Sequence, residues 1–172
     1  MQVIVSDTCC IIDLKEGELL ALIFGLPYEF IIPEDLFEDE LLSFSEEEKR
    51  LLVALGLSPQ ELDPGQVQLA YDHRQAAKAL TVKDCYALAL AQTTDDSILL
   101  TGDRNLRKRS ESLSIETHGV IWALDRMLEK SCCSAQQALI ALEQWKTNPS
   151  VFLPDDQLDF RIRRLRSQAR NS

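Results

Sequence analysis

The chain has 172 residues, of which 45% are hydrophobic, which is enough for one domain with a sizeable core. Its apolar runs are too short to cross a bilayer, and a strand pattern starts at the first residues, so we expect a cytoplasmic protein without membrane contact. The net charge of −10 argues against a passive nucleic-acid coat, which needs a basic face.

The charge is unevenly distributed along the chain. Residues 34–48 contain eight acids and no base, whereas residues 161–170 contain five arginines and no acid. A second basic cluster, Arg104, Arg107, Lys108 and Arg109, directly follows Asp103. The two basic clusters are candidate sites for contact with a polyanion, although the protein as a whole is acidic.

The five cysteines are two adjacent pairs and a single residue, without a C-x-x-C spacing, and the two histidines are isolated. A zinc site is therefore not expected, and reduced, mostly buried thiols are the simplest interpretation.

In chain order, the hydrophobic patterns predict a strand at 2–5, a helix at 9–25 that is broken near Gly17, and a strand at 28–32. Thr8 is the expected cap of the first helix. Helices follow at 33–43, with proline in the first turn, and at 45–56, where Ser45 and Glu48 have the form of a capping box. Residues 58–64 are expected to form a turn-rich connection.

In the second half, helices are expected at 71–80 and 81–93, a strand at 98–101, a short basic helix after Asp103 and a last strand at 114–116. Helices at 119–129, 134–145 and 154–170 complete the chain. Strands that alternate with helices predict a three-layer α/β/α fold, with a central parallel sheet of four to five strands and helices on both faces. We expect an α/β domain at 1–130 and a helical extension at 131–172 packed on it.

Two of the predicted strands end in an aspartate. Asp7 follows the run Val3–Val5, and Asp103 follows the run Ile98–Leu100. In open parallel sheets, ligands bind beyond the carboxyl ends of the strands, so both acids are candidates for one pocket. A role as turn or cap residues is the alternative for both.

Helical periodicity selects Glu40 from the acidic run. Glu40 follows Leu36 by four residues and therefore lies on the face that Phe37 and Leu41 make apolar. A carboxylate on a buried face costs several kcal/mol unless it is paired or coordinated. The other acids of the run are expected to be solvated.

Asp84 stands at the start of an apolar helix and has two open interpretations. It could reach the same pocket, or it could complete a capping box with Thr81. Carboxylates gathered in one pocket repel one another, and a hard divalent cation relieves that repulsion. An acidic pocket beside basic clusters suits phosphate chemistry.

Four motifs, at 3–8, 31–41, 80–91 and 99–106, resemble in order and spacing those of PIN-domain ribonucleases. The resemblance covers about residues 1–130. It implies metal-dependent RNA cleavage by Asp7, Glu40, Asp84 and Asp103, which would also bind one or two Mg²⁺ or Mn²⁺ ions. Small bacterial members are largely the VapC-like toxins of type II toxin–antitoxin pairs, and the helices after residue 130 resemble a subgroup with a C-terminal extension.

The resemblance also suggests supporting roles. Thr8 and Thr101 could hold waters or phosphate oxygens, or could simply be a helix cap and a strand end. Arg104, Arg107 and Lys108 are candidates for RNA contact, with solvated surface residues as the alternative. The expected partners are RNA, an antitoxin protein and a second copy of the chain.

Two other functions remain open. A PIN fold that no longer cuts could serve as a partner-binding module. An acidic-site phosphatase of the haloacid-dehalogenase type is less suited, because its Asp-x-Asp motif would need an acid where Cys9 stands.

The final predicted helix carries a narrow apolar stripe, Leu158, Ile162, Leu165 and Ala169. The stripe could pack on the protein's own core. It could also form an interface with a second copy or an antitoxin.

Overall fold

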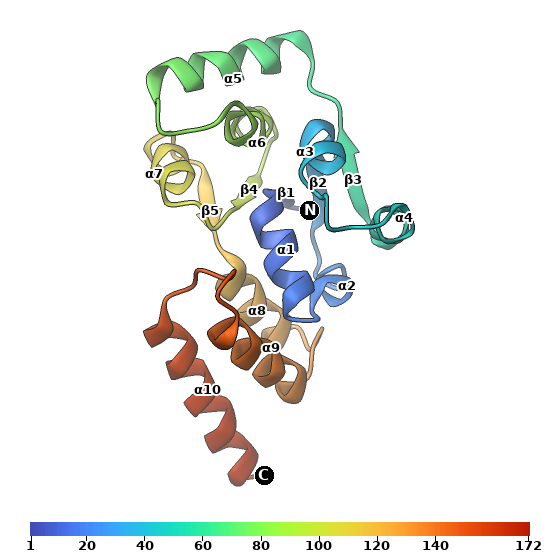
Figure 1. Cartoon of the computed structure of the whole chain (residues 1–172), viewed down its shortest axis with the longest axis vertical. Coiled ribbons are helices and arrows are strands. Elements are labelled where there is room, and N and C mark those ends of the chain that lie inside the picture. The colour runs from blue at the N-terminus through green and yellow to red at the C-terminus, as the bar shows by residue number, and fades with distance from the viewer.

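Five short strands form one parallel sheet at the centre of the computed structural model, which describes all 172 residues (Figure 1). The strands are β1 Val3–Ser6, β2 Glu29–Pro33, β3 Leu57–Gln60, β4 Ser97–Leu100 and β5 Glu116–His118. Their order across the sheet is β3-β2-β1-β4-β5. The direction of winding therefore reverses between β1 and β4, and ligands of such sheets bind outside the carboxyl ends of the strands at this point.

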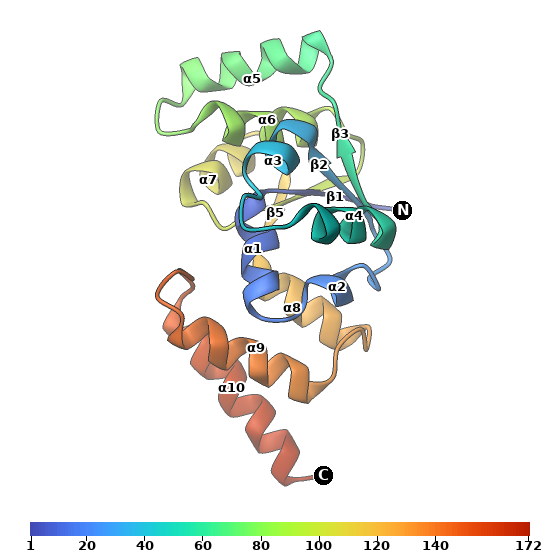
Figure 2. The ribbon, with the colours of Figure 1, turned by 45° about the vertical axis from the view of Figure 1, so that its right-hand side comes forward.

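Helices cover both faces of the sheet, which confirms the predicted α/β/α architecture (Figure 2). One face is crossed by α6 Val82–Gln92, which contacts β1, β2 and β4 and is flanked by α5 Pro64–Ala76 and α7 Arg104–Ser112. The other side holds α1 Thr8–Glu16, α2 Leu20–Ile23 and α8 Val120–Glu129, which contact one another. Two more helices lie at the β3 side, α3 Glu34–Asp39 and α4 Glu46–Leu55.

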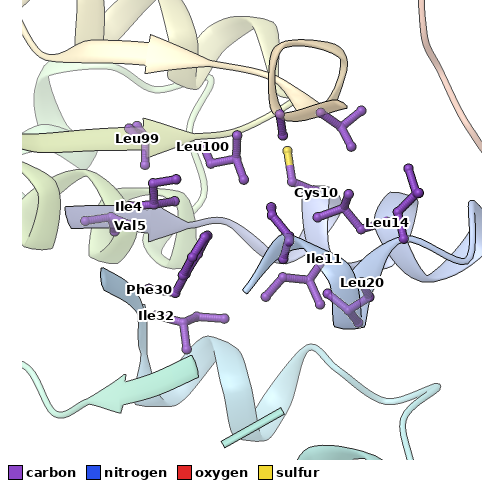
Figure 3. Packing of buried hydrophobic residues seen from close by; sticks show 14 of the residues in the cluster. Ile4, Val5, Cys10, Ile11, Leu14, Leu20, Phe30, Ile32, Leu99 and Leu100 are labelled. Atoms are coloured by element: carbon purple, nitrogen blue, oxygen red, sulfur yellow. The ribbon is translucent and has the colours of Figure 1, made fainter. Parts of the chain in front are cut away.

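The hydrophobic core is built on the two central strands (Figure 3). Ile4 and Val5 of β1 and Leu99 of β4 are fully buried, because these strands have neighbours on both sides and helices above and below. Leu14 of α1 packs into the same cluster. Each such side chain contributes roughly 1.5–3 kcal/mol through burial. The rigid centre fixes where β1 and β4 end, and hence where Asp7 and Asp103 lie.

The C-terminal extension consists of α9 Ala135–Thr147 and α10 Asp155–Arg170. Trp145 of α9 is only 1% exposed and its Nε1 donates a hydrogen bond to the carbonyl oxygen of Asp13, at the end of α1, over 2.7 Å. Gly17 makes this approach possible, because a Cβ there would lie 2.9 Å from the indole nitrogen. α9 is therefore packed into the main core.

α10 packs on α9, and its C-terminal end projects away from the sheet (Figure 2). Leu158, Ile162 and Leu165 are buried in the common core, whereas Ala169 is exposed. The apolar stripe of this helix thus packs mainly on the protein itself. No helix in the structure combines the length and the apolar character that crossing a bilayer requires.

The expectation for residues 58–64 was wrong in part, because residues 57–60 form the edge strand β3. Pro59 hides this strand in the sequence, since proline is tolerated only where a strand has a free edge. Helix α5 starts at Pro64, seven residues before the expected start, because Asp63 and Gln66 form a capping box. β5 lies two residues later than predicted.

Two local predictions near the site were also wrong. The helix expected at 33–43 ends at Asp39, so Glu40 is its C-cap and not an interior residue. The N-cap of α1 is Asp7, whose side chain accepts from the Thr8 amide, and not Thr8 itself. Ser45 caps α4 as predicted, but Glu48 does not complete a capping box, because its carboxylate pairs with Lys15.

Candidate functional site

Asp7 and Asp103 lie beyond the carboxyl ends of the two central strands. Ser6 of β1 is in register with Leu100 of β4, and the Asp7 amide donates to the Leu100 carbonyl oxygen over 2.9 Å. Asp103 comes three residues after β4 ends and is the N-cap of α7, where its Oδ1 accepts from the Leu106 amide over 2.8 Å. The sheet therefore brings both strand-end acids to its switch point.

Asp7 is buried, with 5% of its surface exposed, and is surrounded by hydrogen-bond donors. Its Oδ1 accepts from the Thr8 amide, and its Oδ2 accepts from the Thr101 hydroxyl over 2.8 Å and from the Cys9 thiol over 3.3 Å. None of these donors carries a positive charge. The carboxylate is held in place, but its negative charge is not neutralised.

The pKa of Asp7 is accordingly raised from 3.8 to about 6. Burial is the main cause, and the hydrogen bonds from Thr101 and Cys9 oppose it because they favour the charged form. The negative charges of Asp84 and Glu40 raise the pKa further. Both of these carboxylates therefore lie within electrostatic reach of Asp7.

Glu40 reaches the pocket from the end of α3. The Thr8 hydroxyl donates to Glu40 Oε2, which ties the first turn of α1 to the residue that ends α3. Glu40 is half-buried, as its periodicity suggested, although the helix that was expected to carry it stops before it. Thr8 thus orients a carboxylate of the pocket, a role that differs from both a helix cap and a water ligand.

Asp84 forms the capping box that the sequence allowed. Its Oδ2 accepts from the Thr81 amide over 2.8 Å, and its own amide donates to the Thr81 hydroxyl over 3.1 Å. Its charge still acts on Asp7. The two interpretations of Asp84 are therefore compatible, because a cap at this position also places the carboxylate beside the pocket.

Thr101 connects the two strand-end acids. Its hydroxyl donates to Asp7 and accepts from the Asp103 amide over 3.1 Å, and the residue is fully buried. One hydroxyl thus fixes the distance between the backbone of Asp103 and the carboxylate of Asp7. Thr101 acts on the position of the acids, beyond merely ending the strand.

In this conformation, no three His, Cys, Asp or Glu side chains form a ready-made metal cage. Glu40, Asp84 and Asp103 each have a carboxylate oxygen engaged by a donor of the chain itself. Asp84 and Glu40 act electrostatically on the buried, unneutralised Asp7, whereas Asp103 is linked to it through its backbone amide and Thr101, and all four offer carboxylate oxygens. Such a set fits Mg²⁺ or Mn²⁺, which are held by a few carboxylates and keep several waters.

Cys9 belongs to the pocket, which the sequence reasoning did not foresee. Besides its contact with Asp7, its sulfur accepts from the Gly102 amide over 3.2 Å. The only available signal was its place two residues after Asp7, in the first turn of a helix that starts at the strand end. All five cysteines are free, as expected, and three of them are buried.

The basic cluster after Asp103 divides into different surroundings. Arg104 is exposed and Arg107 is half-buried, with its Nη2 at 3.5 Å from the Thr101 carbonyl oxygen, and both line a groove that begins at Asp103. Lys108 is exposed and lies outside that groove. Arg109 turns to the other side, where it meets His73 of α5.

The fold and the site together define an α/β protein with an acidic pocket at the switch point of a parallel sheet. The family model of the PIN domain known as DUF3368 matches residues 3–167, so the chain belongs to the PIN-domain family, which has a nuclease-type fold. The match continues through α9 and most of α10. Comparison with curated proteins and with solved structures gave no significant match.

Proposed function

We propose that this PIN-domain protein is a Mg²⁺- or Mn²⁺-dependent ribonuclease that hydrolyses phosphodiester bonds. The observation that carries the proposal is the buried Asp7, which has no cationic partner and lies within electrostatic reach of two further carboxylates. Burying such a charge is costly, and a divalent cation would relieve the cost.

Asp7, Asp103, Asp84 and Glu40 would hold the cation, directly or through water. When bound, the cation supplies the charge that acidifies a water molecule and stabilises the phosphate and the departing oxygen. Thr101 and Thr8 orient Asp7 and Glu40 through their hydroxyl groups. Arg104 and Arg107, beside Asp103, attract the phosphate backbone.

Asp103→Asn tests this proposal. Asparagine also caps helices well, so the bond to the Leu106 amide and the fold should persist while the charge is lost. RNA cleavage in Mn²⁺ should fall by about 10²-fold or more, the order of magnitude found when a group that stabilises the transition state is removed. Asp39→Asn, at an exposed acid of α3, is the matched control and should cleave normally.

A binding module without catalysis is the second candidate, because the carboxylates of Glu40, Asp84 and Asp103 already have hydrogen-bond partners without a metal. Cleavage that is abolished by EDTA and by Asp103→Asn would exclude this candidate. Cleavage that survives both treatments would exclude the assignment of these acids as the catalytic residues.

We further propose that the protein is the toxin of a toxin–antitoxin pair and forms a homodimer. Its net charge of −10 would favour a basic antitoxin segment. Leu51 and Leu55, which are exposed and one turn apart on α4, offer an apolar surface to a second copy. Growth arrest on expression of the wild type but not of Asp7→Asn would support the toxin role, and the mass in solution would test the dimer.

A further inference from the structure

A groove of about 940 Å³ leads from Asp103 to the segment that connects α9 and α10. One wall comes from the start of α7, the end of β5 and the first turns of α8, and the other from residues 152–157 and Arg161 of α10. The groove thus joins the candidate catalytic site to the C-terminal extension. None of the proposed catalytic steps uses its far part.

Flat aromatic rings line this groove. His118 stacks on Trp122, with ring centroids 4.2 Å apart and planes within 5° of each other, so each ring covers one face of the other and only the outer faces of the pair remain for a base. Phe152, in the opposite wall, is 90% exposed, although it is one of the most hydrophobic side chains of the protein. Aromatic rings in such positions are the surfaces on which single-stranded nucleic acids stack their bases.

The groove carries an excess of one positive charge, in a chain whose net charge is −10. It contains Arg104, Arg107 and Arg161, against Asp103 and Asp125. Arg161 is held by Asp125 through two hydrogen bonds of 2.9 and 2.7 Å, whereas Arg104 is exposed and makes no ion pair. Gly119 leaves room for Arg107, because a Cβ there would lie 3.1 Å from its Nη2. Positive charge is therefore available beside Asp103.

We propose that this groove binds the single-stranded RNA that flanks the cleaved bond, with bases stacked on the outer face of the His118–Trp122 pair and on Phe152, and phosphates beside Arg104 and Arg107. The proposal rests on the ribonuclease function proposed above. Single strands are preferred over duplexes because the bases of a duplex already stack on one another and cannot reach the rings. The extension would then select the substrate.

Binding can be measured separately from cleavage. The probe is a fluorescein-labelled, unstructured 12-nucleotide RNA, titrated with the full-length protein in EDTA and followed by fluorescence anisotropy. Phe152→Ala should weaken binding about 5- to 150-fold, the range expected for one lost stacking partner. Phe160→Ala is the matched control, because Phe160 is a 57% exposed phenylalanine of α10 outside the groove.

Two further readouts locate the RNA. The chain has two tryptophans, and Trp145 is buried, so quenching of tryptophan fluorescence by unlabelled RNA would report stacking on Trp122. Arg104→Ala should lower the slope of log Kd against log salt by about 0.7, the value for one phosphate contact on a single strand. Arg50→Ala, at an exposed arginine of α4, should leave the slope unchanged.

The proposal is overturned if the wild type does not bind the single-stranded RNA in EDTA. A protein segment would then be the better candidate for the ligand of the groove. It is equally overturned if the Phe152 and Phe160 variants bind alike, or if a duplex of the same sequence binds as tightly. RNA binding that depends on Phe152 without cleavage in Mn²⁺ would refute the nuclease and keep the groove. Cleavage by Phe152→Ala with an unchanged KM would keep the nuclease and refute the groove as the RNA-binding site.

Discussion

The raised pKa of Asp7 has a measurable consequence for stability in the absence of metal. The folded protein binds this proton with a pKa of about 6, and the unfolded chain with a pKa near 3.8. The protonated form is therefore favoured by folding. The stabilisation from protonated Asp7 is fully present below pH 3.8 and is lost as the pH rises through 6. At neutral pH, the ionised Asp7 therefore destabilises the metal-free protein.

The size of this effect follows from the shift. About 2.2 pKa units correspond to about 3 kcal/mol in all, of which about 2 kcal/mol falls between pH 4.5 and pH 7.5. Asp7→Asn removes the titration, and its amide oxygen can still accept from the Thr8 amide. The stability of the variant relative to wild type should therefore increase by about 2 kcal/mol across this pH range.

Urea unfolding in EDTA at several pH values measures this difference directly. Asp13→Asn is a suitable control, because burial also raises the pKa of Asp13 to about 6 on the same helix. Both variants should lose part of the pH dependence, but only Asp7→Asn should also lose the stabilisation by Mn²⁺. A pH dependence in Asp7→Asn equal to that of wild type would refute the reasoning.

Three other substitutions test the contacts around the pocket and the extension. Gly17→Ala should cost about 1–3 kcal/mol of unfolding free energy, because its Cβ would overlap Trp145, and calorimetry would show an unchanged melting temperature if this packing were wrong. Trp145→Phe should cost about 0.5–1.5 kcal/mol for the lost hydrogen bond alone, because the Asp13 carbonyl oxygen keeps the Gly17 amide as its other donor; combined with Gly17→Ala, the losses should be less than additive. Thr101→Val removes the hydrogen bond from the Thr101 hydroxyl and should raise the pKa of Asp7 further. RNA cleavage should therefore fall more at pH 6.5 than at pH 8.5. An equal loss of cleavage at both pH values would argue against a role for this hydrogen bond.

The C-terminal extension changes what the protein can contact as well as how stable it is. α9 packs on the C-terminal end of α1 through Trp145. The N-terminal end of the same helix holds Asp7, its N-cap, and Thr8. The segment before α10 adds Phe152 to the groove that begins at Asp103. The same 42 residues therefore join the core of the domain and one wall of the proposed RNA path.

The sequence by itself determined the helices and strands that have strong local signals. The apolar runs of β1, β2 and β4 mark buried strands, and Thr81, Ser134 and Ser45 mark helix starts. These signals succeed because the burial of a central strand and the cap of a helix each depend on neighbouring residues. The edge strand β3 was not predicted, because an edge strand needs no continuous apolar run and tolerates Pro59.

The candidate acids were also visible in the sequence, but their relations were decided by the tertiary structure. A strand end can be recognised locally, whereas the pairing of β1 with β4 brings together residues more than ninety positions apart. Only that pairing turns the Thr101 hydroxyl toward Asp7, and only the end of α3 brings Glu40 to Thr8. The groove depends on the tertiary structure still more. Arg104, Trp122 and Phe152 line it together only because α7, α8 and the extension pack side by side, and no sequence periodicity encodes that packing.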